Sequence, residues 1–94
     1  MTGEQLEAIA RGMSKPTDRQ LDVLRFIADY IESHRFAPSI REICDAIGVS
    51  GNNTVAGPGG HLDLLERKGL IGRRAGVSRA LWITDAGAAL MGAE

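Results

Sequence analysis

Two helix-start signals in succession constrain the fold of this chain more than any other feature. Thr17 is followed three residues later by Gln20, and Ser39 is followed in the same way by Glu42. Each pair forms a capping box, in which the first side chain accepts a hydrogen bond from a helix amide and the second reaches back. Pro38 separates the two, because a proline disfavours helical geometry at the residue before it. The sequence therefore predicts two consecutive helices joined by a short connection.

Apolar residues follow each capping box at helical spacing. The two stripes consist of Leu21, Leu24, Ile27, Ala28 and Ile31, and of Ile40, Ile43, Cys44 and Ile47. Gly48 then stands where helices commonly end in a left-handed residue. A short second helix that ends at a glycine, with a third cap signal in Ser50, Asn52 or Asn53, is typical of a helix-turn-helix.

After Gly69 the hydrophobic period changes from that of a helix to that of a strand. The runs "LIGRR" and "RALWIT" are separated by a small loop at 75–78, which predicts two antiparallel strands that lean on the helices. The fold class is therefore α+β, mainly α: a winged helix-turn-helix with a three-helix core and a two-stranded β-hairpin wing. We expect this domain to span 16–84. An N-terminal extension at 1–15 forms either a short helix over 4–13 or a frayed end, and 85–94 forms a tail or a short helix capped by Thr84.

The composition favours one small soluble domain. The chain has 94 residues, of which 44% are hydrophobic and 24% are charged. No apolar run approaches the roughly 18–20 residues of a membrane span. One cysteine cannot form an internal disulfide, so we expect a cytoplasmic protein with no membrane contact. His34, His61 and Cys44 are too scattered for a metal site, and we expect no cofactor, no small-molecule substrate and no enzymatic activity.

The charge is unevenly distributed along the chain. The net charge of −1 at first argues against nucleic acid, but residues 61–84 carry +3, against −2 for 1–60 and −2 for 85–94. The basic residues of this segment are Arg67, Lys68, Arg73, Arg74 and Arg79. Phosphate binding requires a local basic face and not a basic protein, so the C-terminal third can supply one.

Three motifs carry a resemblance to a known family. The stretches "APSIREI", "LERKGLI" and "SRALWI" lie at the start of the second helix, the end of the third and the second strand. Across roughly residues 17–84 the chain closely resembles the N-terminal DNA-binding domain of the LexA family of SOS repressors. The resemblance implies binding to a palindromic operator in double-stranded DNA, repression of damage-response genes, and a homodimer on two half-sites.

The same resemblance does not extend to the second activity of that family. Its self-cleaving peptidase domain uses a serine–lysine pair in a C-terminal region without a counterpart here, and the only lysines are Lys15 and Lys68. We therefore expect a lone DNA-binding domain or a shortened form of a longer protein, without self-cleavage.

The third helix should place its first residues against base edges in the major groove, while other elements touch the backbone. Asn53 aligns with a base-contacting asparagine of LexA-type helices, and asparagine can pair with adenine through both amide atoms. The alternative is that Asn52 or Asn53 only caps the helix. In the wing, Arg73 and Arg74 alternate faces, so one of them should face DNA. The complete set of expected DNA contacts is Ser39, Arg41, Ser50, Asn52, Asn53, Thr54, Ala56, His61, Arg73, Arg74, Ser78 and Arg79.

The segment Gly57–Gly60 interrupts this third helix. Compared with the LexA pattern it adds about three residues, and a mid-helix proline costs about 3 kcal/mol. Two outcomes follow. Either 53–56 forms a short turn and a helix resumes near Gly60 and runs to Lys68, or the break acts as a hinge for a swapped dimer. We favour the first, because Leu62 and Leu65 can anchor the second part. An alternative function remains, namely a protein-interaction or dimerisation module whose DNA reading is impaired.

Overall fold

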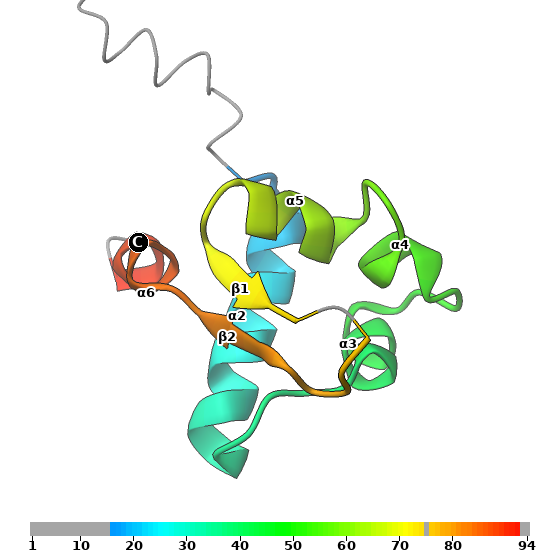
Figure 1. Cartoon of the computed structure of the whole chain (residues 1–94), viewed down its shortest axis with the longest axis horizontal. Coiled ribbons are helices and arrows are strands. Elements are labelled where there is room, and N and C mark those ends of the chain that lie inside the picture. Colours follow the sequence, from blue (N-terminus) through cyan, green and yellow to red (C-terminus); the bar gives the residue numbers. More distant parts are fainter. Residues whose placement is uncertain (1–15, 75, 93–94) are drawn as a thin grey trace, which may run out of the picture.

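The computed structural model describes residues 16–74 and 76–92, which form helices packed beside a two-stranded sheet (Figure 1). Its helices are α2 (Asp18–His34), α3 (Ile40–Ile47), α4 (Asn53–Ala56), α5 (His61–Arg67) and α6 (Asp85–Gly92), and its strands are β1 (Ile71–Arg73) and β2 (Leu81–Ile83). The strands are antiparallel, with Ile71 opposite Ile83 and Arg73 opposite Leu81. The predicted winged helix-turn-helix is confirmed. None of these helices is long and apolar enough to cross a membrane.

Both predicted capping boxes are present. Thr17 Oγ1 accepts from the amide of Gln20 at 3.1 Å, and Gln20 Oε1 accepts from the amide of Thr17 at 3.1 Å. Ser39 and Glu42 form the same pair of bonds at the start of α3. Gly48 ends α3 with a φ of 79°, the left-handed conformation that favours glycine. The predicted helix over 4–13 lies outside the described residues.

The core lies where α2, α3 and α5 meet the inner face of the sheet. Leu24, Ile27 and Val23 of α2 are fully buried, whereas Leu21 and Ile31 are only partly buried. The buried face of α2 is thus rotated from the predicted stripe, since it includes Gln20. Gln20 Oε1 accepts from Lys68 Nζ at 2.7 Å, which satisfies this buried polar group and links the start of α2 to the end of α5.

The interruption divides the third helix into two, so the favoured outcome is confirmed. α4 ends at Ala56, and α5 begins at His61 and ends at Arg67, one residue before the predicted end. The chain turns back tightly here: a Cβ on Gly60 would lie 2.8 Å from the carbonyl oxygen of Thr54. Val55 and Leu62 are both fully buried, so the core holds the two helices on either side of the break.

For residues 85–94 the sequence left two alternatives, a tail or a short helix. The structure has a helix here, α6, which is described as far as Gly92. Thr84 Oγ1 accepts from the amide of Gly87 at 3.0 Å and donates to the carbonyl of Gly69 at 2.6 Å. Gly87 is buried, and a Cβ there would meet the carbonyl oxygen of Leu70 at 2.2 Å. The glycine that weakens this helix by propensity is therefore the residue that lets it pack against the connection between α5 and β1.

We predict that Gly87→Ala lowers the free energy of unfolding by about 1–3 kcal/mol, because the added methyl group meets backbone that cannot move freely. Denaturant unfolding followed by circular dichroism measures the change. Gly92→Ala is the matched control in the same helix, since nothing lies within 4 Å of its added Cβ. Equal stability of the two variants would contradict the close packing of α6.

Candidate nucleic-acid interface

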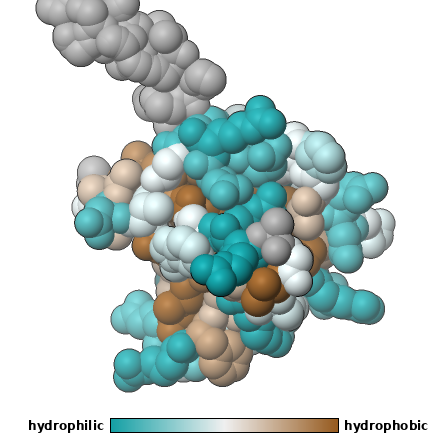
Figure 2. Space-filling model, viewed as in Figure 1, coloured by the Kyte–Doolittle hydropathy of each residue, from teal (hydrophilic) through white to brown (hydrophobic). Residues whose placement is uncertain are grey.

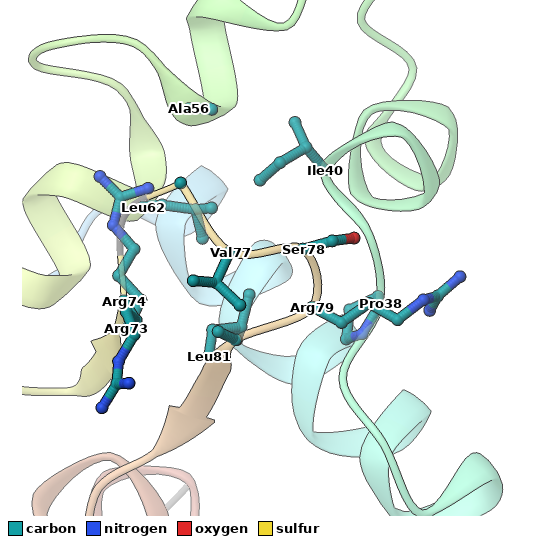
Figure 3. A pocket seen from close by; sticks show the side chains of 12 residues that line it. Pro38, Ile40, Ala56, Leu62, Arg73, Arg74, Val77, Ser78, Arg79 and Leu81 are labelled. Atoms are coloured by element: carbon teal, nitrogen blue, oxygen red, sulfur yellow. The ribbon is translucent and has the colours of Figure 1, made fainter.

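A groove of about 360 Å³ separates the wing from the helices. Pro38 and Ile40 at the start of α3 line one side, Ala56 at the end of α4 lies above, and Arg74 and Ser78 approach from the wing (Figure 3). The groove therefore brings together three segments that are far apart in the sequence, and all three contain residues predicted to contact DNA.

The four residues of α4 divide into an anchor and an exposed face. Val55 is fully buried, while Asn52, Asn53 and Thr54 are exposed. Asn52 occupies the N-cap position with helical dihedral angles, and its side chain makes no capping bond. Its Oδ1 lies instead 3.6 Å from Cys44 Sγ. The capping interpretation of Asn52 is therefore wrong, since its side chain turns toward Cys44, and the exposed polar side chains of α4 itself are those of Asn53 and Thr54.

At the start of α3, the Ser39 hydroxyl is already engaged. It accepts from the amide of Glu42 at 3.1 Å, as in any capping box. Arg41 follows on the exposed surface of the same turn. This end of α3 lies beside the groove, because Pro38 and Ile40 form part of its lining.

The adjacent arginines of the wing point in opposite directions, as predicted from strand alternation (Figure 3). Arg73 Nε lies 3.1 Å from Glu66 Oε1 of α5. Arg74 is exposed, lines the groove, and makes no side-chain ion pair or hydrogen bond with the residues that the structure describes. Between these two, Arg74 is the cation available to a phosphate.

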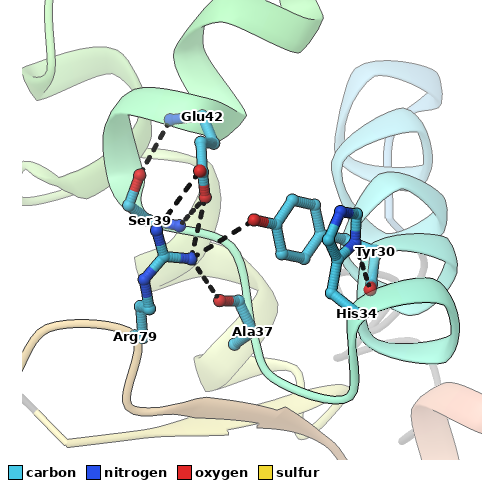
Figure 4. Close-up of polar contacts among 6 residues, drawn as sticks. All are labelled: Tyr30, His34, Ala37, Ser39, Glu42 and Arg79. Atoms are coloured by element: carbon cyan, nitrogen blue, oxygen red, sulfur yellow. Dashed lines mark hydrogen bonds and ion pairs between the residues drawn. The ribbon is translucent and has the colours of Figure 1, made fainter.

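Arg79 departs from its expected place at the tip of the wing. Its guanidinium group turns back onto the protein, where Nη1 donates to Glu42 Oε1 and to the carbonyl of Ala37, each at 2.9 Å (Figure 4). Sequence could place Arg79 in the loop but could not reveal this carboxylate, which lies 37 residues earlier in the chain. Ser78, beside it, is exposed.

His61 is separated from the exposed face of α4 by the interrupting loop. It begins α5, is partly buried, and its pKa is lowered by burial and then by the nearby Arg19 guanidinium. Ser50 is exposed in the turn after α3. Of the expected contacts, Ala56, Arg73, Arg74, Ser78 and Arg79 line the groove, whereas His61 does not.

Most of the arginines between residues 61 and 84 form ion pairs. Besides the Arg73 pair, Arg67 Nε lies 3.2 Å from Asp63 Oδ1, and Arg79 Nη1 lies 2.9 Å from Glu42 Oε1. On the face in Figure 2, hydrophilic and apolar side chains are interspersed. Among the described residues, the large apolar side chains of Phe36, Val77 and Trp82 are exposed. Within residues 16–74 and 76–92, no three His, Cys, Asp or Glu side chains gather as a metal site would require.

Glu42 is the most strongly perturbed carboxyl group beside the groove. The hydrogen bond from Arg79, followed by that from the Ser39 amide, lowers its pKa from 4.5 to about 2. Because the folded state has the lower pKa, the ionised carboxylate stabilises the fold fully above pH 4.5. This contribution decreases as the pH falls and is lost below about 2.

Comparison with known proteins agrees with this geometry. Residues 13–80 match the family model described as LexA DNA binding domain. A LexA repressor of Lactobacillus delbrueckii is 44% identical over 80 residues, which cover 85% of this chain and 37% of the relative. A LexA repressor of Anaeromyxobacter dehalogenans is 49% identical over 76 residues, which cover 81% of this chain and 32% of the relative. The chain therefore spans about a third of the length of the curated relatives it matches.

We predict that Arg79→Gln raises the pKa of Glu42 from about 2 toward 4.5, because the largest cause of the lowering is removed. A pH titration of the side-chain carboxyl carbon by NMR gives the midpoint. Arg67→Gln serves as the control, since its guanidinium pairs with Asp63, and should leave the Glu42 midpoint unchanged. An unaltered midpoint in Arg79→Gln would show that the Glu42–Arg79 contact is not formed in solution.

Proposed function

The chain belongs to the family of LexA DNA-binding domains, and we propose that it acts as a sequence-specific transcriptional repressor on double-stranded DNA. The observation that carries the proposal is the shared orientation of α4 and the wing. Asn53 and Thr54 are exposed on α4 and Asn52 just before it, and the last residue of α4 lines the same groove as Arg74 and Ser78. A winged helix-turn-helix binds DNA with a reading helix and a wing on one side.

In the proposed complex, α4 enters the major groove and the wing follows the neighbouring backbone. Asn53 can present both amide atoms to an adenine, and Thr54 can offer its methyl group to a thymine. Arg74 and Ser78 are placed to meet the phosphates that pass over the groove, and Arg41 to meet those beyond the start of α3. Ser39 and Ser50 contribute at the edges of this surface.

The interruption limits how much of the third helical segment can read bases. α4 has four residues, and the chain then turns away through Gly57–Gly60 before α5 begins. The amide of Gly59 donates to Asp63 Oδ2 at 2.8 Å, so a carboxylate occupies this loop. The pKa of Asp63 is lowered by that bond, and its negative charge would repel a phosphate. Base reading therefore falls to Asn52–Ala56, and His61 lies behind the loop.

We further infer that two copies bind the two halves of a palindromic operator in the cytoplasm, in damage-response control. This part of the proposal rests on the similarity to the LexA repressors alone. Two-fold operators match the two-fold symmetry of helix-turn-helix dimers. The protein would then act by occupying a promoter, a role that needs no cofactor.

A protein-interaction module is the second candidate. It is favoured by the shortness of α4 and by the exposure of Phe36, Val77 and Trp82. Titration with duplex DNA distinguishes the two functions. A repressor should prefer a duplex selected from a random pool over random duplex by a factor of roughly 10³ or more, and should weaken steeply as salt rises. Absence of duplex binding at low salt would leave the interaction module.

We predict that Arg74→Gln weakens binding and reduces the slope of log K against log salt by about 0.9, the loss of one phosphate contact. Binding to the selected duplex is measured by fluorescence anisotropy at several salt concentrations. Arg67→Gln removes an equally charged side chain that pairs with Asp63 and does not line the groove, so its slope should match the wild type. Equal slopes for all three proteins would remove Arg74 from the interface.

A further inference from the structure

Arg79 joins the wing to α3, to the connection between α2 and α3, and to α2, where its Nη1 lies 3.4 Å from the Tyr30 hydroxyl. It lies just before β2, and its guanidinium donates from Nη1 to Glu42 Oε1 at 2.9 Å and from Nη2 to Glu42 Oε2 at 3.2 Å (Figure 4). The carbonyl of Ala37 accepts a further bond at 2.9 Å, and the group also stacks over the Phe36 ring at 5.1 Å. A bidentate pair fixes orientation as well as distance.

Glu42 makes this contact while closing the capping box of α3. Its Oε1 accepts both from the Ser39 amide, at 2.7 Å, and from Arg79. One carboxylate thus connects the first turn of α3 to the loop of the wing. These are two of the segments that line the groove, so the Glu42–Arg79 contact links two of its walls.

The backbone of Arg79 supports the same interpretation. Its φ is 60°, a left-handed conformation that side-chain-bearing residues rarely adopt. This left-handed turn occurs at the residue whose guanidinium contacts Glu42 and the carbonyl of Ala37. On the same wing, Arg74 has no positive φ, and its side chain forms no ion pair or hydrogen bond with residues 16–74 and 76–92, so the two arginines divide anchoring and phosphate contact between them.

We propose that Arg79 is a positioning residue for DNA recognition, which acts through Glu42 to hold the wing at a fixed separation from α3 and does not itself contact phosphate. This inference rests on the proposed DNA binding. It assigns to Arg79 a role opposite to the one that its place in a basic loop suggests. Its positive charge is balanced by Glu42, and its donors are turned toward the protein.

A double-mutant cycle with Arg79→Gln, Glu42→Gln and the double variant tests the proposal. Glutamine at position 42 keeps the capping box, because this position accepts either residue, and removes only the negative charge. Affinity for the duplex that the wild type selects from a random pool is measured across salt concentrations. Each single variant should weaken binding on the order of tenfold, the double variant no further, and the salt slope should stay that of the wild type.

Direct phosphate binding by Arg79 would give a different set of results. If Arg79 binds phosphate, Glu42→Gln removes a competing carboxylate and tightens binding, while Arg79→Gln reduces the salt slope by about 1. Either outcome, or additive losses in the double variant, overturns the proposal.

The Arg79→Lys variant distinguishes a loss of wing positioning from a loss of positive charge and from a loss of folding. It retains the positive charge but cannot form the bidentate pair, so it should bind as weakly as Arg79→Gln, with melting by circular dichroism confirming that it is folded. Affinity equal to the wild type would overturn the positioning role. A wild-type protein that binds no duplex at low salt would overturn the proposed function itself, and this inference with it.

Discussion

The burial of Val55 holds α4, and with it the exposed side chains proposed to read bases, in place. A helix of four residues has no stability of its own, and α4 is followed by a segment that cannot continue it. Val55 is fully buried, as is Leu62 on the far side of the break. The core therefore fixes the two helices on either side of the break. The exposed side chains of Asn53 and Thr54 keep a defined direction although α4 does not continue into α5.

Electrostatic contacts within the chain then decide which charges remain for a ligand. Most of the positive charge that suggests nucleic-acid binding is paired with carboxylates of the same domain, since Arg67, Arg73 and Arg79 all form ion pairs. Such exposed pairs contribute little stability singly. Their effect here is to reduce the free positive charge of the wing to Arg74 and to tie the wing to α3. Affinity for phosphate should accordingly be modest, and discrimination should depend on α4.

The sequence predicts what depends on neighbours in the chain. The capping boxes, the left-handed Gly48 and the break at Pro58 all follow from local rules, and the structure has each of them. Contacts between distant segments escape such rules. The turn of Arg79 toward Glu42 depends on tertiary proximity, as does the contact of Asn52 with Cys44 that is present in place of a helix cap. The sequence therefore predicts the helices and the wing more accurately than it predicts the direction of individual side chains.

Selection of preferred duplexes from a random pool tests most directly whether the front of α4 reads bases. The account predicts that the wild-type chain enriches a defined consensus, and that Asn53→Ala loses the preference for adenine at one position in each half-site while the rest of the consensus remains. Identical consensus sequences for the two proteins, or no enrichment by the wild type, would contradict it.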